Sequence, residues 1–360
     1  MDRSERSAFD GHPERESVDT DEEPTVTRRQ ALGAVGGIGL LGGAGKALDN
    51  VVLGYGVLVG TNLIEQDLGT LVDERFGPTT TGWRTDQYRL RYRDGRLTVM
   101  DADNRLVTRL PITDTTPTQA AEWDDRLGLT SGPLEELSRD LSAIAAGNYR
   151  FEFGKTDSFF ETAADGTARP YTVGAIRGNR FRRPTPDLIE RFTDADPADP
   201  AAVIAGLKTG FREYSGYDMP RYAAGSIQDN VLFDAIDLRA PFQSPTDFES
   251  IIAGENTGLF CYEFAYRSIE ALHAVAPIRQ RLPVAGAVVT DSRHKHVYTG
   301  VASAVRRDGE LVFPMTFVDY THATLYDDLA MRGMLGEGLE AYNRRHRTDN
   351  VFWNRYARWR

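Results

Sequence analysis

The sequence predicts an α+β fold in which a helix beginning at residue 261 packs on an antiparallel sheet, with a smaller α+β region before it. Residues 86–112 and 296–302 alternate between polar and apolar side chains, as half-buried strands do. Apolar residues instead recur at helical spacing in 133–146, 201–214 and 261–275. Hydrophobic residues make up 41% of the 360 residues, which is enough to bury a core.

The composition is acidic and poor in lysine. The formal net charge is -11, from 53 acidic and 42 basic residues, and 38 of the basic residues are arginine because only four are lysine (42 − 4). A dense carboxylate surface stays soluble where salt screens its self-repulsion, so the composition resembles that of proteins from extreme halophiles. Broad nucleic-acid binding needs a basic surface, and we therefore expect no nucleic-acid partner.

The N-terminal residues indicate export. Residues 1–27 are polar and acidic without apolar periodicity, which is typical of a disordered leader. The paired arginines Arg28 and Arg29 are followed closely by Leu32 and by an uncharged run rich in Gly, Ala and Leu at 31–45. This arrangement resembles a twin-arginine export signal, and the run is too short for an ordinary transmembrane span.

Residues 28–64 are therefore expected to be a twin-arginine-type signal or a membrane anchor. A second uncharged run occupies 50–64. Three alternatives stay open: the signal is cleaved, residues 31–64 remain as an anchor, or 50–64 is a core helix of the mature protein. We expect an extracytoplasmic protein, secreted or anchored to the outer face of the cytoplasmic membrane, with membrane association through 31–64.

Residues 65–190 are expected to form an α+β N-terminal region that carries no chemistry of its own. Its first strands form a hairpin that turns at residues 93–95. Strand-like sequence follows at 107–112, 149–153 and 171–176, and helical sequence at 133–146. The region is either a separate domain or a decoration on the domain that follows.

Residues 191–335 are expected to form the domain that carries the chemistry. A proline-marked start leads into a helix over 201–214, and 212–249 is irregular and rich in turn residues. In the tail, 336–360, arginines lie among aromatic residues. A docked C-terminal helix whose arginines pair with the acidic body is favoured there over a surface for anionic lipid or nucleic acid.

The single cysteine lies at the start of the predicted helix 261–275. A loop with Gly254 and Gly258 leads into Cys261, and the chain cannot form an internal disulfide. The positive end of the helix dipole favours a thiolate over a thiol at this position. Thiol hydrolases prepare their nucleophile in this way, so Cys261 is the candidate nucleophile.

A base and an orienting acceptor for Cys261 are expected on the strands that follow. His296 begins an alternating segment in which His296, Tyr298 and Gly300 share one face, and a turn at 307–309 returns the chain. The next strand ends at Asp319, which can meet His296 across an antiparallel pair. The imidazole would point at Cys261 if the helix packs over this face of the sheet.

The order of these residues resembles the transglutaminase-like superfamily of papain-related thiol enzymes. Cys261-Tyr262-Glu263-Phe264-Ala265 matches its Cys-x-x-Phe-Ala helix, His296-Val297-Tyr298 its His-x-aromatic strand, and Asp319-Tyr320-Thr321 its Asp-Pro-Thr ending. A strand at 278–286 would follow the helix. The sequence departs from the family in having Gly258 three positions before the cysteine, Tyr298 for Trp and Tyr320 for Pro.

The resemblance implies a papain-like core with Cys261, His296 and Asp319 as catalytic residues. It implies a thiol enzyme that hydrolyses or transfers acyl groups at amide bonds of a protein or peptide substrate, with no metal or organic cofactor. The alternative is a catalytically inactive binding or structural module of the same fold, anchored outside the cell. His294 competes with His296 as the base, and His322 is a third, peripheral candidate.

Overall fold

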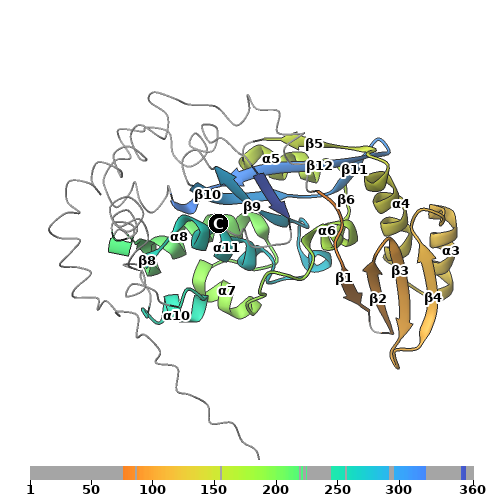
Figure 1. The fold of residues 1–360 in the computed structure, drawn as a ribbon, viewed down its shortest axis with the longest axis horizontal. Coiled ribbons are helices and arrows are strands. Elements are labelled where there is room, and N and C mark those ends of the chain that lie inside the picture. The colour runs from red at the N-terminus through yellow and green to blue at the C-terminus, as the bar shows by residue number, and fades with distance from the viewer. Residues whose placement is uncertain are drawn as a thin grey trace, which may run out of the picture.

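The computed structural model describes a mixed α+β protein built on antiparallel sheets, as the sequence predicts (Figure 1). It describes residues 76–85, 87–154, 156–218, 220, 221, 224, 245–255, 258–291, 296–321 and 350–353. The segments at 1–75 and 322–349, and with them the predicted signal or anchor at 28–64, His322 and most of the tail, lie outside the described residues, as does His294.

The largest sheet has seven strands and is mostly antiparallel. Its order is β13 (Asn350–Trp353), β9 (Ala285–Asp291), β10 (His296–Ala302), β12 (Glu310–Val318), β11 (Val305–Arg307) and β6 (Thr167–Ala168), and β5 (Tyr149–Phe153) pairs with β12 in parallel. Val288, Val289 and Val301 have no exposed surface, because the central strands are covered on both faces. Strands buried on both faces read as continuous apolar runs rather than as alternating ones.

Helices cover one face of this sheet. α11 (Cys261–Leu272) packs on β10 and β9, and α8 (Pro200–Tyr214) packs on α11. The N-cap Asp199 of α8 accepts from two backbone N–H groups, and Pro200 at the first position needs no acceptor. α7 (Pro186–Thr193) and α10 (Phe248–Ile252) complete this layer and a second apolar cluster with it. A short parallel pair, β7 (Gly216–Tyr217) and β8 (Gly258–Leu259), precedes α11.

A second, four-stranded antiparallel sheet lies in the N-terminal region, at the right of Figure 1. Its strands are β1 (Thr81–Arg84), β2 (Tyr88–Arg93), β3 (Arg96–Asp101) and β4 (Leu106–Pro111). Asp94 and Gly95, both at positive φ, form the two-residue turn of the predicted hairpin. Helices α3 (Pro117–Leu127) and α4 (Pro133–Ala145) pack on one face, as the helical spacing of 133–146 predicts.

The two sheets share one hydrophobic core, joined through β5, α6 (Pro170–Arg177) and Phe76. The ring of Phe76 lies 4.7 Å from that of Phe313 in β12 and 5.3 Å from that of Trp353 in β13. The N-terminal region therefore contributes strands to the main sheet as well as a sheet of its own. α5 (Thr156–Ala164) and the short helix η4 (Pro277–Arg279) complete the described elements.

Three sequence predictions of local structure are wrong. Residues 171–176 form helix α6 rather than a strand, because Pro170 starts the helix and a short, wholly buried apolar run suits either structure. The strand expected at 278–286 begins only at Ala285, since the prolines before it cannot donate to a ladder. In the tail, residues 350–353 are an edge strand paired with β9 and not part of a docked helix.

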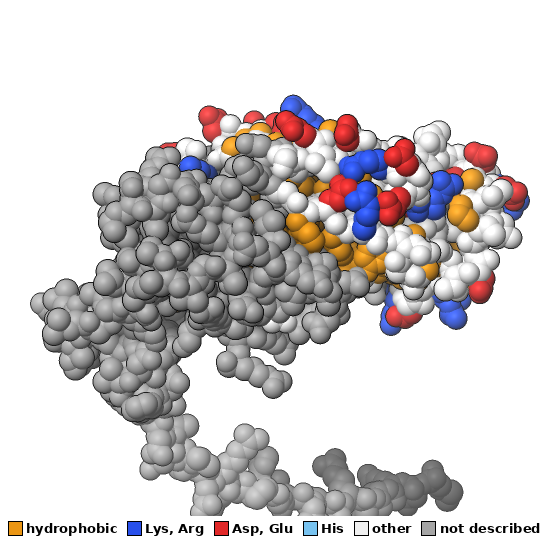
Figure 2. All heavy atoms as spheres, turned by 90° about the horizontal axis from the view of Figure 1, so that it is seen from above, with side chains coloured by type: hydrophobic (Ala, Val, Ile, Leu, Met, Phe, Trp, Pro, Cys, Tyr) orange, Lys and Arg blue, Asp and Glu red, His pale blue; other side chains and the backbone are white. Residues whose placement is uncertain are grey.

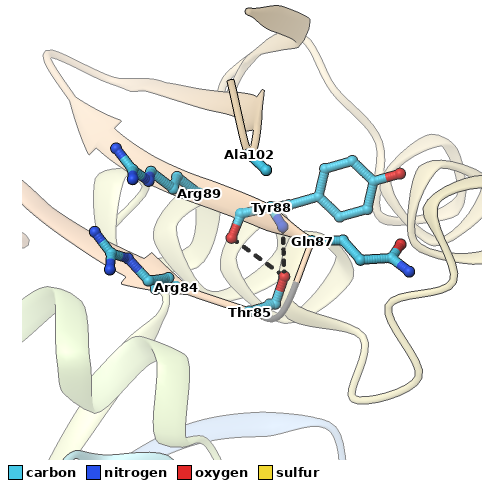
Figure 3. A pocket seen from close by; sticks show the side chains of 6 residues that line it. All are labelled: Arg84, Thr85, Gln87, Tyr88, Arg89 and Ala102. Atoms are coloured by element: carbon cyan, nitrogen blue, oxygen red, sulfur yellow. Dashed lines mark hydrogen bonds between the residues drawn. The ribbon is translucent and has the colours of Figure 1, made fainter. Parts of the chain in front are cut away.

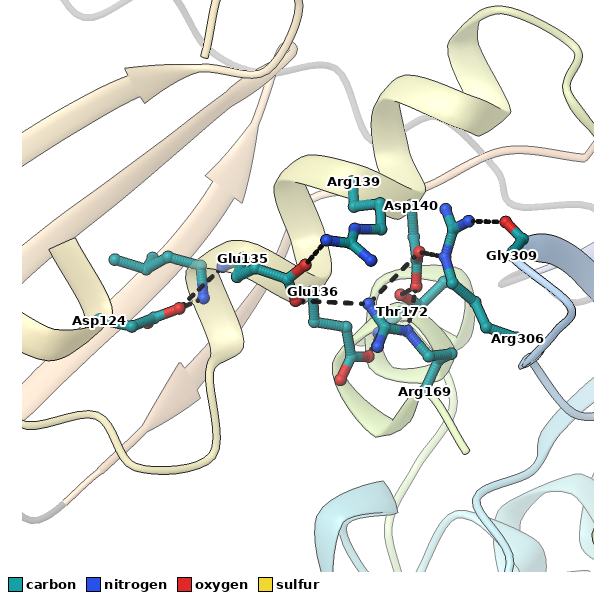
Figure 4. Close-up of polar contacts among 10 residues, drawn as sticks. Asp124, Glu135, Glu136, Arg139, Asp140, Arg169, Thr172, Arg306 and Gly309 are labelled. Carbon is teal, nitrogen blue, oxygen red and sulfur yellow. Dashed lines mark hydrogen bonds and ion pairs between the residues drawn. The ribbon is translucent and has the colours of Figure 1, made fainter. Parts of the chain in front are cut away.

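The buried carboxylate of Asp140 on α4 ties the N-terminal helices to the main sheet (Figure 4). It accepts from Arg169 Nε at 2.7 Å, from Arg306 Nε of β11 at 2.8 Å and from the Thr172 hydroxyl at 2.7 Å. Figure 4 shows these groups converging on one carboxylate from α6 and β11.

On the surface view of Figure 2, acidic and basic side chains lie side by side over much of the described part.

Replacing Asp140 by Ala should therefore lower the free energy of unfolding by about 3–5 kcal/mol, because two arginines lose their buried counter-charge. Urea denaturation of the two proteins measures this difference. The matched control Asp103→Ala removes an aspartate whose ion pair with Arg105 is exposed, and should change little. Equal effects of the two substitutions would contradict a structural role for Asp140.

Candidate active site

Cys261 is the first residue of α11, with Phe260 in extended conformation before it. Its side chain is partly exposed and borders a small apolar cluster that includes Ala265, Val288 and Val297. The residue is thus partly buried against hydrocarbon side chains and partly exposed. Backbone N–H groups in the first turn of a helix lack acceptors within the helix, so the cysteine stands where an anion is stabilised.

His296 and Asp319 form a buried pair beside this cysteine. His296 Nε2 lies 2.6 Å from Asp319 Oδ2, and the two residues are 3% and 1% exposed. The second carboxylate oxygen of Asp319 accepts the backbone N–H of Thr321 at 3.0 Å, which fixes the carboxylate. The Cys261 side chain is close enough to the same imidazole to raise its pKa.

The structure therefore brings together the three residues predicted from sequence, but not by the route expected. Val297 packs on α11, and the Thr299 hydroxyl lies 2.6 Å from that of Ser268 on the helix. The middle of β10 thus turns its odd-numbered residues toward α11, whereas the face of His296 and Tyr298 was expected there. His296 is the first residue of β10, and its ring stacks on that of Tyr298 at 6.1 Å, so it lies on the other face of the strand from Val297 and Thr299.

Electrostatics at the pair favour a charged imidazole. Burial lowers the pKa of His296, but the Asp319 carboxylate, its hydrogen bond and the Cys261 side chain outweigh burial and raise that pKa to about 10. At neutral pH the imidazole is then protonated and faces a carboxylate on one side and the thiol on the other. A protonated imidazole is the charge partner that a cysteine thiolate requires.

A buried arginine anchors the first turn of α11. Arg221 donates from Nη1 to both carboxylate oxygens of Glu263, at 2.9 and 3.1 Å, and from Nη2 to the Tyr262 hydroxyl at 2.7 Å. Its guanidinium also lies 4.3 Å from the ring centroid of Phe260. Glu263 in turn accepts the backbone N–H of Phe260 at 2.7 Å. Arg221 thus compensates the charge of a carboxylate that lies two residues from Cys261.

A second buried arginine anchors the other end of the helix. Arg177 is 1% exposed and donates to the carbonyls of Leu272 and Val275 at 3.2 and 2.7 Å, as well as to Val284. His273 at the helix end accepts the N–H of Gly286 at 2.9 Å. Burial, followed by the charges of Arg177 and Arg183, lowers the pKa of His273 well below its usual value, so it is neutral. The last carbonyls of α11 are therefore satisfied.

Two departures from the transglutaminase-like pattern have a structural account. Tyr320, which stands where the family has proline, is buried, and its hydroxyl donates to the carbonyl of Ile204 on α8 at 3.2 Å. It ties the segment that carries Asp319 to the helical layer. Gly258 lies against Asp218, and a Cβ at this glycine would come within 2.8 Å of the Asp218 side chain. The close pairing of β7 and β8 therefore requires glycine at this position.

Sequence reasoning missed Arg221 and Arg177. The only signal for Arg221 was an unpaired-looking Glu263 in the first turn of a predicted helix, and its partner lies 42 positions away. Among the described residues, no group of three or more histidine, cysteine, aspartate or glutamate side chains is placed to hold a metal ion. Within the same residues, no helix has the length and apolarity to cross a bilayer.

Comparison of the chain with protein-family models, with curated proteins and with solved structures gave no match. The geometry of Cys261, His296 and Asp319 is therefore the evidence from which a function is inferred.

The raised pKa of His296 predicts a pH-dependent stability. A histidine whose pKa is higher in the folded protein stabilises the fold below about 6.5, and this contribution is lost as the pH rises toward about 10. Urea unfolding at several pH values should show a fall of a few kcal/mol across that window, and Asp319→Asn should abolish it. The control His273→Gln, at the other end of α11, should keep the same slope. A slope unchanged by Asp319→Asn would contradict the buried ion pair.

Proposed function

We propose that this protein is a thiol enzyme of the transglutaminase-like, papain-related type, acting on amide bonds of proteins or peptides. The single observation that carries the proposal is a partly exposed Cys261 at a helix start, beside an imidazole whose Nε2 lies 2.6 Å from the buried Asp319 carboxylate. A cysteine used only for packing needs neither a neighbouring imidazole nor a carboxylate behind that imidazole.

The chain order and the elements support a papain-like core as part of this proposal. The nucleophile begins a helix, the base begins the strand β10 that this helix packs on, and the acceptor follows the neighbouring antiparallel strand β12. The same order, cysteine, histidine and aspartate, characterises the family that the sequence resembles.

The proposed reaction begins with the Cys261 thiolate attacking the carbonyl carbon of an amide. The first N–H groups of α11, with that of Cys261 among them, stabilise the oxyanion that develops. The His296 imidazolium gives its proton to the leaving amine, the C–N bond breaks and a thioester forms. Water or a second amine then attacks the thioester, His296 takes its proton, and Cys261 leaves as the thiolate.

Asp319 has a positioning role in this scheme. Its carboxylate accepts from Nε2 of His296, which leaves Nδ1 to exchange the proton with sulfur and substrate. Hydrolysis and acyl transfer share the first half-reaction and differ only in what resolves the thioester. The paired arginines and apolar run of 28–64 add the proposal that the enzyme works outside the cytoplasm, secreted or anchored through 31–64.

The test uses a generic amide substrate with and without a primary amine acceptor. Wild-type protein should release the amine from a fluorogenic peptide, or crosslink the acceptor to it, and Cys261→Ser should do neither. His296→Ala and Asp319→Asn should each lower kcat/KM by about 10²–10⁴-fold.

The matched control is His273→Gln, which removes the other buried histidine near α11 and should leave kcat/KM within a few-fold of wild type. Alkylation of the single cysteine by iodoacetamide provides an independent readout of the site. If the alkylation rate instead rises with pH as for an ordinary thiol, with a pKa near 8.5, and does not change in His296→Ala, the inactive binding module is favoured.

A further inference from the structure

The outward face of the N-terminal sheet is covered with arginines. The face of β2 and β3 that packs on α3 and α4 carries Leu90, Tyr92, Leu97 and Val99, all buried. The residues that alternate with these point away from the helices. On that opposite face the four strands place Arg84, Arg89, Arg91, Arg93, Arg96 and Arg109. We call these six residues the arginine face.

The pairing register sets like charges directly opposite each other. Arg84 lies opposite Arg89 across β1 and β2, and Arg93 lies opposite Arg96 across β2 and β3. Like charges at opposed positions of an antiparallel pair destabilise a sheet. Two such like-charge pairs lie on one small face of a protein whose net charge is -11.

The arginine face has little internal compensation. Within the described residues only Arg93 forms an ion pair, with the exposed Asp94 of the hairpin turn, and Arg89 donates to the neutral side chain of Asn104. Several arginines elsewhere on the surface are matched, as Arg281 is by Asp196 and Asp199, at 3.2 and 2.6 Å. Among the described residues, five of the six arginines thus have no ion-pair partner, and such an array of positive charge on an acidic protein fits a polyanionic surface outside the chain.

A hollow at one end of the face has the chemistry of an anion site. Figure 3 shows Arg84 and Arg89 extending to the same side from neighbouring strands. They line a hollow of about 180 Å³ together with Thr85, Gln87, Tyr88 and Ala102, and no carboxylate is among these lining residues. Two adjacent guanidinium groups are a favourable arrangement for a phosphate group.

We propose that the arginine face rests on a membrane of anionic phospholipids and holds the enzyme at its surface. Nucleic acid fits less well, because single strands are bound by aromatic side chains on which bases stack. The outward positions between the arginines are Gly82, Thr98, Met100, Leu106 and Pro111, none of which is aromatic, and Tyr88 is the one aromatic residue that lines the hollow. An array of arginines with a single neighbouring ring fits an array of headgroup phosphates better than a row of stacked bases.

The place of the sheet in the chain agrees with this partner. Sixteen residues, 65–80, separate the uncharged run 50–64 from the start of β1. Even extended, sixteen residues span only roughly 50–60 Å, so a chain held in a bilayer by that run keeps the arginine face near its surface. The face does not depend on the proposed catalytic triad, and either proposal can fail without the other.

The test measures binding of the full chain to vesicles of neutral phosphatidylcholine and to vesicles that also contain phosphatidylglycerol. Replacing Arg84, Arg91 and Arg96 together by Gln should weaken binding to the anionic vesicles on the order of 100-fold, at about fivefold per arginine. Binding to the neutral vesicles should not change. The control triple, Arg139, Arg150 and Arg281 to Gln, removes the same charge from ion-paired sites and should retain most of the affinity.

A second readout is needed because an anchor at 31–64 would hold the chain on either vesicle. A fluorophore at Thr98→Cys, in the Cys261→Ser background, reports the position of the face itself. Lipids with a nitroxide headgroup should quench it on anionic vesicles, and the arginine-face triple should abolish the quenching. Any of three results would overturn the proposal. Vesicle binding could be independent of lipid charge, or both triple variants could lose the same affinity. The arginine face could also bind a single-stranded oligonucleotide instead of vesicles.

Discussion

The buried contact between His296 and Asp319 is the interaction on which the candidate site depends. Two ionisable groups, each at most 3% exposed, are stable together only as partners, because either one alone would be an uncompensated buried charge. The carboxylate fixes the imidazole and raises its pKa to about 10. Cys261 can then lie beside a proton donor at neutral pH, although it comes from a helix on a different part of the chain.

The placement of that helix is the second requirement, and the surrounding fold meets it at both ends. Arg221 holds the first turn of α11 through Glu263, and Arg177 donates hydrogen bonds to carbonyls at and just beyond the end of the helix. Between these anchors the helix lies close on the sheet, where a Cβ at Gly286 would come within 2.8 Å of Ile269. The N-terminal region takes part in this arrangement, since Arg177 belongs to α6 and Asp140 joins α4 to the main sheet.

Much of the fold follows from local sequence, and the site partly does. Helices α4, α8 and α11 and the hairpin at Asp94-Gly95 were predictable, because their periodicity, caps and turn residues are local signals. The strand predicted at 171–176 was wrong, because a short buried apolar run fits a strand or a helix equally well. The face of β10 that meets α11 and the partner of Glu263 depend on contacts between distant segments. Alternation and spacing carry no information about either.

The central claim is that His296 is held as an imidazolium beside Cys261 by Asp319. NMR titration of the protein labelled with ¹⁵N in its histidine side chains tests this most directly. We expect the His296 ring nitrogens to keep the chemical shifts of a protonated imidazole through neutral pH and to titrate at about 10, and we expect Asp319→Asn to lower this pKa. A His296 ring that titrates near 6.5 in the wild type, unchanged by Asp319→Asn, would contradict it.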